Sequence, residues 1–108
     1  MKRFFLLLPA LALGACSMTL PVSGQLQDGT ETFTGKATGH LDGGGILTVT
    51  TSTGVTCRGR FVYVTSREGE GTFQCSDGRS GPFRFVSSGT HGTGQGTLGR
   101  EHFTFTFG

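Results

Sequence analysis

The chain has 108 residues, with nine Lys and Arg against seven Asp and Glu, so its formal net charge is only +2. A charge this small gives no electrostatic argument for binding nucleic acid or an anionic membrane. The 20 glycines lack the strict three-residue period of collagen, and ten Phe and one Tyr are too many for a disordered chain. The composition therefore indicates a folded domain of short strands and tight turns.

The N-terminal segment is typical of a signal peptide. Met1-Lys2-Arg3 is a basic start, and the apolar stretch 4–15 is too short for a bilayer-spanning helix of roughly 20 residues. Its end, Leu13-Gly14-Ala15-Cys16, resembles the lipobox of bacterial lipoproteins. The resemblance implies cleavage before Cys16, attachment of a diacylglycerol to its sulfur, and acylation of the new amino group. An ordinary secretory signal with a chance cysteine is the alternative.

These features predict the domain organisation and the location. We expect a signal peptide over 1–15, a lipidated tether over 16–23, and one repeat domain over 24–108. By the sorting rule of such lipoproteins, Ser17 after the cysteine favours the outer membrane of the bacterial envelope. Lys2 and Arg3 leave with the signal, so nine basic residues become seven against seven acidic ones, and the mature chain is neutral. The expected partners are thus a membrane, through the anchor, and no nucleic acid.

Four glycine-rich segments follow in chain order, each predicted to form a strand, a tight turn and a second strand. Gly24, Gly45, Gly71 and Gly96 are expected to precede or open strands of these copies, the first copy being the weakest. The turns are expected near Asp28-Gly29, Thr53-Gly54, Asp77-Gly78 and Gly99-Arg100. Asp-Gly is a strong hairpin signal, because a type I′ turn needs positive φ at both central residues.

The two remaining cysteines fit one antiparallel register. Pairing 55–64 with 68–77, with a turn near Ser66, places Phe61 opposite Gly71 and Cys57 opposite Cys75. Directly opposed Cβ atoms lie ~4.5–5.5 Å apart, close to disulfide range, and disulfides persist in exported proteins. We expect this bridge to stabilise the fold by roughly 3 kcal/mol. A metal site is the alternative, but the sequence has no Cys-x-x-Cys or His-x-x-x-His spacing.

Strict alternation supports the strands. Phe103, Phe105 and Phe107 should share one face, with Thr104 and Thr106 on the other. Four glycine-rich hairpins after a lipobox resemble the small bacterial β-flower proteins of the fourfold type. That resemblance implies an all-β fold, in which antiparallel hairpins form a shallow pseudo-fourfold barrel. The molecular function of that family is not established, so the resemblance predicts the architecture and no activity.

Candidate site residues are few. The repeat places His40 and His91 on one rim, where Asp42, Arg67 and Glu68 could complete a polar mouth, although solvated loop residues are the simpler interpretation. Arg58, Arg60 and Arg84 could form an anion-binding patch with Arg79. Alternatively, they lie on the solvent-exposed face of a half-buried sheet, paired with Asp or Glu. Gly94 to Gly99 matches G-x-G-x-x-G, but a strand pattern follows it rather than the helix that a dinucleotide site needs.

The sequence therefore predicts a lipid-anchored, non-enzymatic envelope protein without a cofactor, acting as a structural or binding module. Its ligand could be an apolar or acyl group in the aromatic-lined centre. One alternative is an inhibitor of a hydrolase such as lysozyme, using the segment 86–96 as a loop inserted into the enzyme cleft. Another is a small hydrolase or metal site built on His40 and His91, for which no nucleophile–base–orienter order is present.

Overall fold

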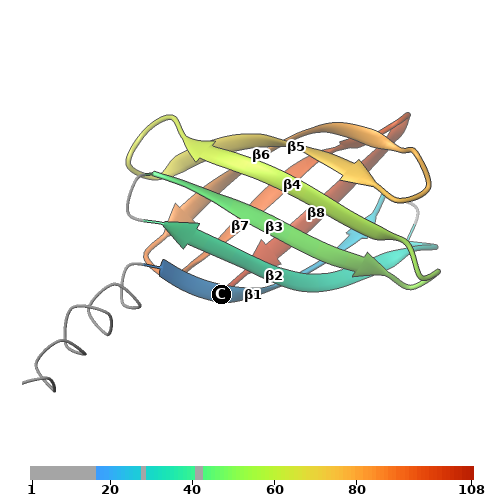
Figure 1. Cartoon of the computed structure of the whole chain (residues 1–108), viewed down its shortest axis with the longest axis horizontal. Helices are drawn as coiled ribbons and strands as arrows, with labels where there is room; N and C mark the ends of the chain where they lie inside the picture. The colour runs from blue at the N-terminus through green and yellow to red at the C-terminus, as the bar shows by residue number, and fades with distance from the viewer. Residues whose placement is uncertain (1–16, 28, 41–42) are drawn as a thin grey trace, which may run out of the picture.

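The structure, a computed structural model, is an eight-stranded antiparallel β-barrel (Figure 1). It describes residues 17–27, 29–40 and 43–108, so the expected signal peptide, Cys16 and Asp42 lie outside the described residues. The strands are β1 (Ser17–Leu26), β2 (Thr32–His40), β3 (Gly44–Thr51), β4 (Thr56–Tyr63), β5 (Glu68–Cys75), β6 (Ser80–Ser88), β7 (His91–Leu98) and β8 (Glu101–Phe107).

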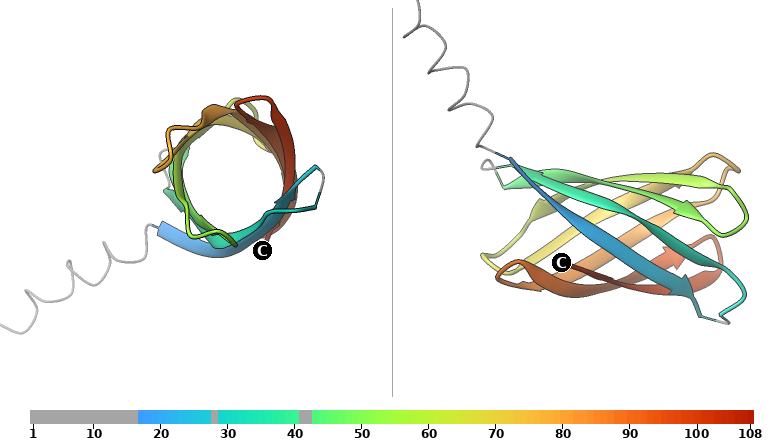
Figure 2. Two further views of the ribbon diagram at one scale, coloured as in Figure 1. Left: turned by 90° about the vertical axis from the view of Figure 1, so that its right-hand side faces the viewer. Right: turned by 90° about the horizontal axis from the view of Figure 1, so that it is seen from below.

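The chain meanders, because every strand pairs with the next one and β8 closes the ring against β1. Figure 2 shows this ring from one end. Closure removes the unpaired edges that make small sheets prone to aggregation. The prediction of an all-β antiparallel barrel is confirmed. In the described part of the chain, no helix is long and apolar enough to cross a membrane.

One end of the barrel carries the four turns that the sequence predicts. Gly29, Gly54, Gly78 and Gly99 all have positive φ, with values of 73°, 90°, 96° and 60°. Glycine adopts this conformation without the steric cost that a Cβ would bring. The turn positions are the predicted ones, but the expected type I′ geometry is wrong. No described residue other than glycine has positive φ, and Gly54 and Gly78 follow the two central residues of turns closed by Gly54 N–H to the Thr51 carbonyl and Gly78 N–H to the Cys75 carbonyl. These turns join β1 to β2, β3 to β4, β5 to β6, and β7 to β8, so they all lie at the same end, which we call the closed end. The opposite end, where β1 begins, is the mouth.

The glycines inside the strands make room for phenylalanine rings. Gly71 of β5 lies opposite Phe61 on one side and Phe83 on the other, and Gly96 of β7 lies between Phe83 and Phe103. A Cβ built on Gly71 would lie 2.6 Å from the Phe83 ring, so this position cannot carry a side chain without movement. The expectation that Gly71 and Gly96 precede or open strands is wrong. Both lie inside strands, where the lack of a side chain leaves room for the rings of neighbouring phenylalanines.

The core follows the expected alternation. Phe103, Phe105 and Phe107 point inward, whereas Thr104 and Thr106 are exposed on the outer wall. The buried apolar side chains are Val22, Leu26, Phe33, Ala37, Leu47, Val49, Cys57, Phe61, Phe73, Phe83, Phe85, Leu98, Phe103 and Phe105. A small barrel has an interior just wide enough for side chains to fill it, and here inward glycines set against inward rings achieve that filling.

The register of β4 and β5 is the predicted one. Cys57 lies opposite Cys75 and Phe61 opposite Gly71. A disulfide joins the two cysteines, whose Cα atoms are 3.9 Å apart. The bridge lies near the closed end, because it ties the start of β4 to the end of β5.

The domain boundary differs from the expected one. Residues 17–23, expected to belong to a tether, lie in β1 and pair with β2 from Ser17↔His40 to Ser23↔Thr34. The reason is that the inside–outside alternation extends further towards the N-terminus than the glycine pattern: Leu20 and Val22 turn inward, and Thr19 and Ser23 turn outward. The barrel thus begins at residue 17, directly after Cys16.

Candidate functional site

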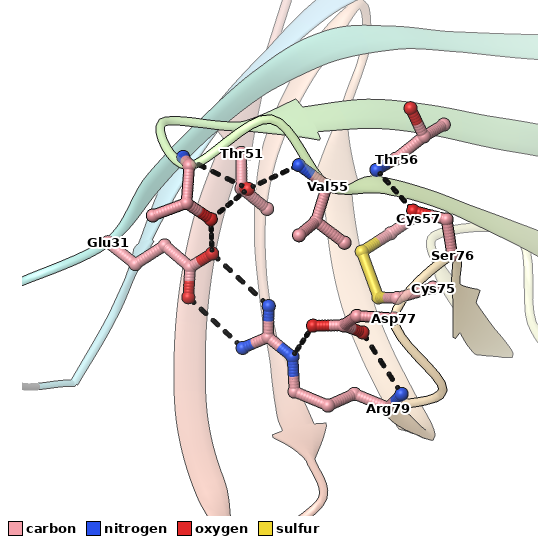
Figure 3. Close-up of a disulfide and its surroundings, with 10 residues drawn as sticks. Glu31, Thr51, Val55, Thr56, Cys57, Cys75, Ser76, Asp77 and Arg79 are labelled. Carbon is pink, nitrogen blue, oxygen red and sulfur yellow. Dashed lines mark hydrogen bonds and ion pairs between the residues drawn. A yellow bond between two sulfur atoms is a disulfide. The ribbon is translucent and has the colours of Figure 1, made fainter.

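A polar cluster centred on Glu31 and Arg79 lies at the closed end (Figure 3). Arg79 Nη1 and Nη2 donate to the two carboxylate oxygens of Glu31 at 3.0 and 3.2 Å. Arg79 Nε also donates to Asp77 at 2.8 Å. Thr53 Oγ1 donates to Glu31 at 2.8 Å. The cluster joins turns from opposite walls of the barrel, since Glu31 precedes β2 and Arg79 precedes β6.

Electrostatics at this end favour the ionised carboxylate. The hydrogen bonds from Arg79, followed by that from Thr53, lower the pKa of Glu31 from 4.5 to about 2, although partial burial opposes them. The same bond to Glu31 raises the pKa of Arg79. Their side chains are 13% and 25% exposed, so the pair is only partly screened by water. Two oppositely charged side chains held in this geometry can tie the β1–β2 and β5–β6 turns together, and we call the Glu31–Arg79 pair the clamp.

Above the clamp, the barrel interior is filled. Phe73, Phe83, Phe103, Leu26 and Cys57 are the largest fully buried side chains. The Phe73 ring lies 4.7 Å from Phe83 and 5.6 Å from Phe103, centroid to centroid. Among the described residues, closely packed aromatic rings therefore fill this half of the barrel.

The mouth half is different, because it contains a cavity of about 110 Å³. The lining is apolar and comes from six strands and one turn: Met18, Leu20, Ala37, Gly39, Leu47, Phe61, Tyr63, Phe85, Gly89, Phe105 and Phe107. Small residues leave the space, since a Cβ built on Gly39 would have no neighbour within 4 Å. Met18 is 55% exposed and Tyr63 38% exposed, so the cavity reaches the surface at the mouth.

Aromatic rings form one wall of the cavity. The Phe85 ring makes edge contacts with Phe61 at 5.2 Å, Tyr63 at 5.3 Å and Phe107 at 5.7 Å between centroids. Edge-to-face pairs of this kind hold rings in fixed positions. The wall is thus preorganised, which lowers the entropic cost of binding an apolar ligand.

A small polar network lies at the edge of this wall. The Tyr63 hydroxyl donates to Ser87 Oγ at 3.4 Å, and Ser87 Oγ donates to the Arg67 carbonyl at 3.3 Å. Arg67 Nε donates a hydrogen bond to the Ser87 carbonyl at 3.3 Å. Ser87 itself is buried. The cavity therefore has an apolar body and one hydroxyl-bearing edge, the usual pattern of a small-molecule site.

The histidines predicted to share a rim do lie at the same end, but they do not converge. His40 ends β2 and His91 begins β7, and β1 and β8 separate them. Three strand spacings amount to about 14 Å along the wall. Both histidines are exposed and neither lines the cavity. Among the described residues no cluster of His, Cys, Asp or Glu could hold a metal; Asp42 lies outside them.

The arginines divide into two places. Arg58, Arg60 and Arg84 lie on the outer wall, where they line an open hollow of about 880 Å³ together with Glu70. Arg79 is absent from this hollow, because it is held at the closed end by Glu31. Arg79 therefore does not join the possible anion-binding patch, and the other three arginines lie on the solvent-exposed face of the sheet, as the alternative interpretation has it.

The segment 86–96 is not a loop. Residues 86–88 end β6, residues 91–96 belong to β7, and only Gly89 and Thr90 connect the two strands. Gly89 has a φ of 74°, which allows this tight connection. The expectation of an insertable loop here is wrong.

The fold and the cavity define a class: closed, up-and-down β-barrels with an apolar cavity at one end. Two solved structures are similar. A redesigned β-barrel, mFAP1, bound to DFHBI, has a TM-score of 0.68 and 18% identity over 82% of this chain and 90% of that chain. A de novo designed fluorescence-activating β-barrel has a TM-score of 0.63 and 18% identity over 82% of this chain and 88% of that chain. At this identity the likeness shows the fold alone. No family model and no curated protein matches the sequence.

Proposed function

We propose that this chain is a lipid-anchored bacterial envelope protein whose barrel is a non-enzymatic binding module for a small apolar ligand or the end of an acyl chain. The observation that carries the ligand class is the cavity of about 110 Å³ at the mouth. Apolar cavities of about 150 Å³ stay dry and bind benzene-sized molecules. A cavity of this size thus favours a short hydrocarbon segment over a whole drug-sized ligand, for which ~300 Å³ or more is usual.

Binding is favoured over catalysis by the lining. Tyr63 is the one residue with an ionisable side chain among those that line the cavity, and its hydroxyl bonds to Ser87. General acid–base or nucleophilic chemistry needs a base within hydrogen-bond reach of the reacting group. His40 and His91, the residues on which an enzymatic function would depend, are not in the lining.

The anchor part of the proposal rests on the sequence. Leu13-Gly14-Ala15-Cys16 follows a basic start and an apolar stretch of signal-peptide length. A diacylglycerol thioether with an added amide-linked acyl chain makes attachment stable, since each buried CH₂ contributes about 0.8 kcal/mol. The presence of Ser17 after Cys16 supports the outer membrane as the destination.

We infer that the barrel is made from four copies of one hairpin, in the pseudo-fourfold manner of the β-flower proteins. The supporting observation is that a positive-φ glycine occupies each of the four closed-end turns.

The ligand proposal is tested by filling the cavity. Gly39→Leu places a side chain in open space within the cavity, whereas Thr34→Leu puts the same side chain on the outer face of β2. Isothermal titration with octanoate as the probe should give binding to the natural chain and to Thr34→Leu. Binding to Gly39→Leu should fall at least tenfold. Equal affinity in all three proteins would rule out the cavity as the site.

A further inference from the structure

The exposed large hydrophobic side chains gather at one end of the barrel. Among the described residues they are Met18, Val62, Tyr63, Val64 and Val86, each between 38% and 56% exposed. Each lies at the mouth: Met18 is the second residue of β1, Val62 and Tyr63 end β4, Val64 follows them, and Val86 is two residues from the end of β6. We call these five residues the apolar collar.

The collar lies on more than one side of the opening. Met18 is on β1, whereas Val62 and Val86 flank β5, which is on the opposite wall of an eight-stranded ring. Met18 and Tyr63 both line the cavity, so the collar and the cavity are continuous. The closed end has no such side chain in the described ranges and carries the charged cluster of Glu31, Asp77 and Arg79 instead. Charged side chains such as Arg67 and Glu68 also lie at the mouth, so the two ends differ in their exposed apolar side chains and not in whether they carry charge.

The chain enters the barrel at the apolar end. Ser17, the first residue of β1, directly follows Cys16, and Figure 1 shows β1 starting at the mouth. Each residue spans at most about 3.6 Å, so a lipid on Cys16 attaches within a few ångström of the barrel. No tether of several residues separates the attachment point from the first strand. A barrel attached in this way has its mouth, and not its closed end, next to the bilayer.

We infer that the apolar collar rests in the surface of the bilayer that holds the anchor, so that the mouth cavity opens toward the lipid acyl chains. The inference rests on the proposed lipidation of Cys16. Large apolar side chains exposed together at one end of a fold are typical of an interaction site, and here the bilayer is the surface that the attachment point brings nearest. The arrangement also gives an apolar ligand a route from the hydrocarbon into the cavity without passing through water.

The chain contains its own reporter for this contact. Tyr63 is the single Tyr and there is no Trp, so intrinsic fluorescence comes from the collar itself. The mature lipidated protein is reconstituted into phosphatidylcholine vesicles, with or without bromine atoms on the acyl chains near the carbonyl end. We expect Tyr63 emission to fall at least twofold in brominated vesicles. Iodide in the water should quench it less than in a Cys16→Ser protein produced without residues 1–15, which carries neither the lipid nor the signal peptide.

The collar is then tested by Val62→Thr, Val64→Thr and Val86→Thr together. Threonine keeps the β-branched shape that strands favour, and all three sites are exposed, so the barrel should stay folded. The anchor still carries this variant to the vesicles, but bromine quenching of Tyr63 should drop to less than half that of the natural sequence. Thermal unfolding measured alongside verifies that the variant is folded.

The outcomes separate the two proposals. Protein that does not float with the vesicles overturns the lipid anchor, whatever its fluorescence. Protein that floats but shows no bromine quenching keeps the anchor and overturns the collar contact. If the Cys16→Ser protein produced without residues 1–15 forms dimers that the three threonine substitutions abolish, the collar belongs to a contact with a second copy of the chain, and the bilayer contact is overturned.

Discussion

Glu31 and Arg79, separated by 48 positions in sequence, form a bidentate ion pair at the closed end of the barrel, with N···O distances of 3.0 and 3.2 Å. The pair connects the β1–β2 and β5–β6 turns, which lie on opposite walls. A fork-to-fork pair of this geometry is the strong form of a charged hydrogen bond. The clamp lies at the closed end, whereas the cavity on which the ligand proposal rests lies at the mouth.

The clamp predicts a pH-dependent stability. Glu31 has a folded-state pKa of about 2 against 4.5 ordinarily, so its contribution is complete above pH 4.5 and is lost as the pH falls toward 2. Glu31→Gln should lower the free energy of unfolding by about 1–3 kcal/mol at pH 7. Urea unfolding at a series of pH values should show this difference shrinking below pH 4.5. Glu70→Gln on the outer wall serves as the control, and a gap that stays constant to pH 2 would contradict the assignment.

The packing of phenylalanine rings over glycines predicts that a Gly→Ala substitution changes the stability of the fold differently at two inward-facing positions. Gly71→Ala places a Cβ against the Arg60 carbonyl and 2.6 Å from the Phe83 ring, so we expect a loss of about 2 kcal/mol or more. Gly39→Ala enters open space at a strand position that any residue can adopt. It should be neutral, or stabilise by up to about 1 kcal/mol. Thermal melting of the two variants compares them directly, and similar melting temperatures would refute the packing argument.

The disulfide predicts a large loss when it is removed. Cys57→Ala combined with Cys75→Ala should cost roughly 2–5 kcal/mol, a large part of the stability of a small domain. Mass spectrometry of the non-reduced mature protein should find the 57–75 linkage alone, as the opposed positions on β4 and β5 require. A peptide linked through Cys16 would be incompatible with a lipid on that sulfur.

The anchor predicts a specific labelling pattern. Cys16→Ser should leave the precursor unlipidated and uncleaved by the lipoprotein peptidase, because the motif depends on the thiol. Cells fed a radioactive fatty acid should label the natural chain and not this variant. Incorporation at the same level in both would show that the lipobox interpretation is mistaken.

The sequence was informative where a local rule governs the structure. The positive-φ turns at Gly54 and Gly78 and the Cys57–Cys75 register follow from turn chemistry and period-two alternation, both readable along the chain. The pairing of β8 with β1 could not be predicted from such local rules. Pairing between segments that are distant in sequence depends on strand tilt and stagger around the whole barrel.

The site was harder to predict for the same reason. The spacing of the glycines predicts that the domain starts at residue 24. Met18 and Leu20, which line the cavity, therefore fall in the predicted tether. The alternation of Thr19, Leu20 and Pro21 was the available signal. The Glu31–Arg79 pair had no such signal, since nothing in the sequence relates two turns on opposite walls.

Binding of hydrocarbon in the mouth cavity can be observed through nuclear Overhauser contacts between ¹³C-labelled octanoate and the aromatic rings. We expect contacts from the terminal methyl group to the Phe85 and Phe107 rings, which line the cavity, and none to Phe73, which is fully buried toward the closed end. A bound probe that contacts residues of the outer hollow around Arg58 and Arg84, with no contact to Phe85 or Phe107, would contradict this proposal.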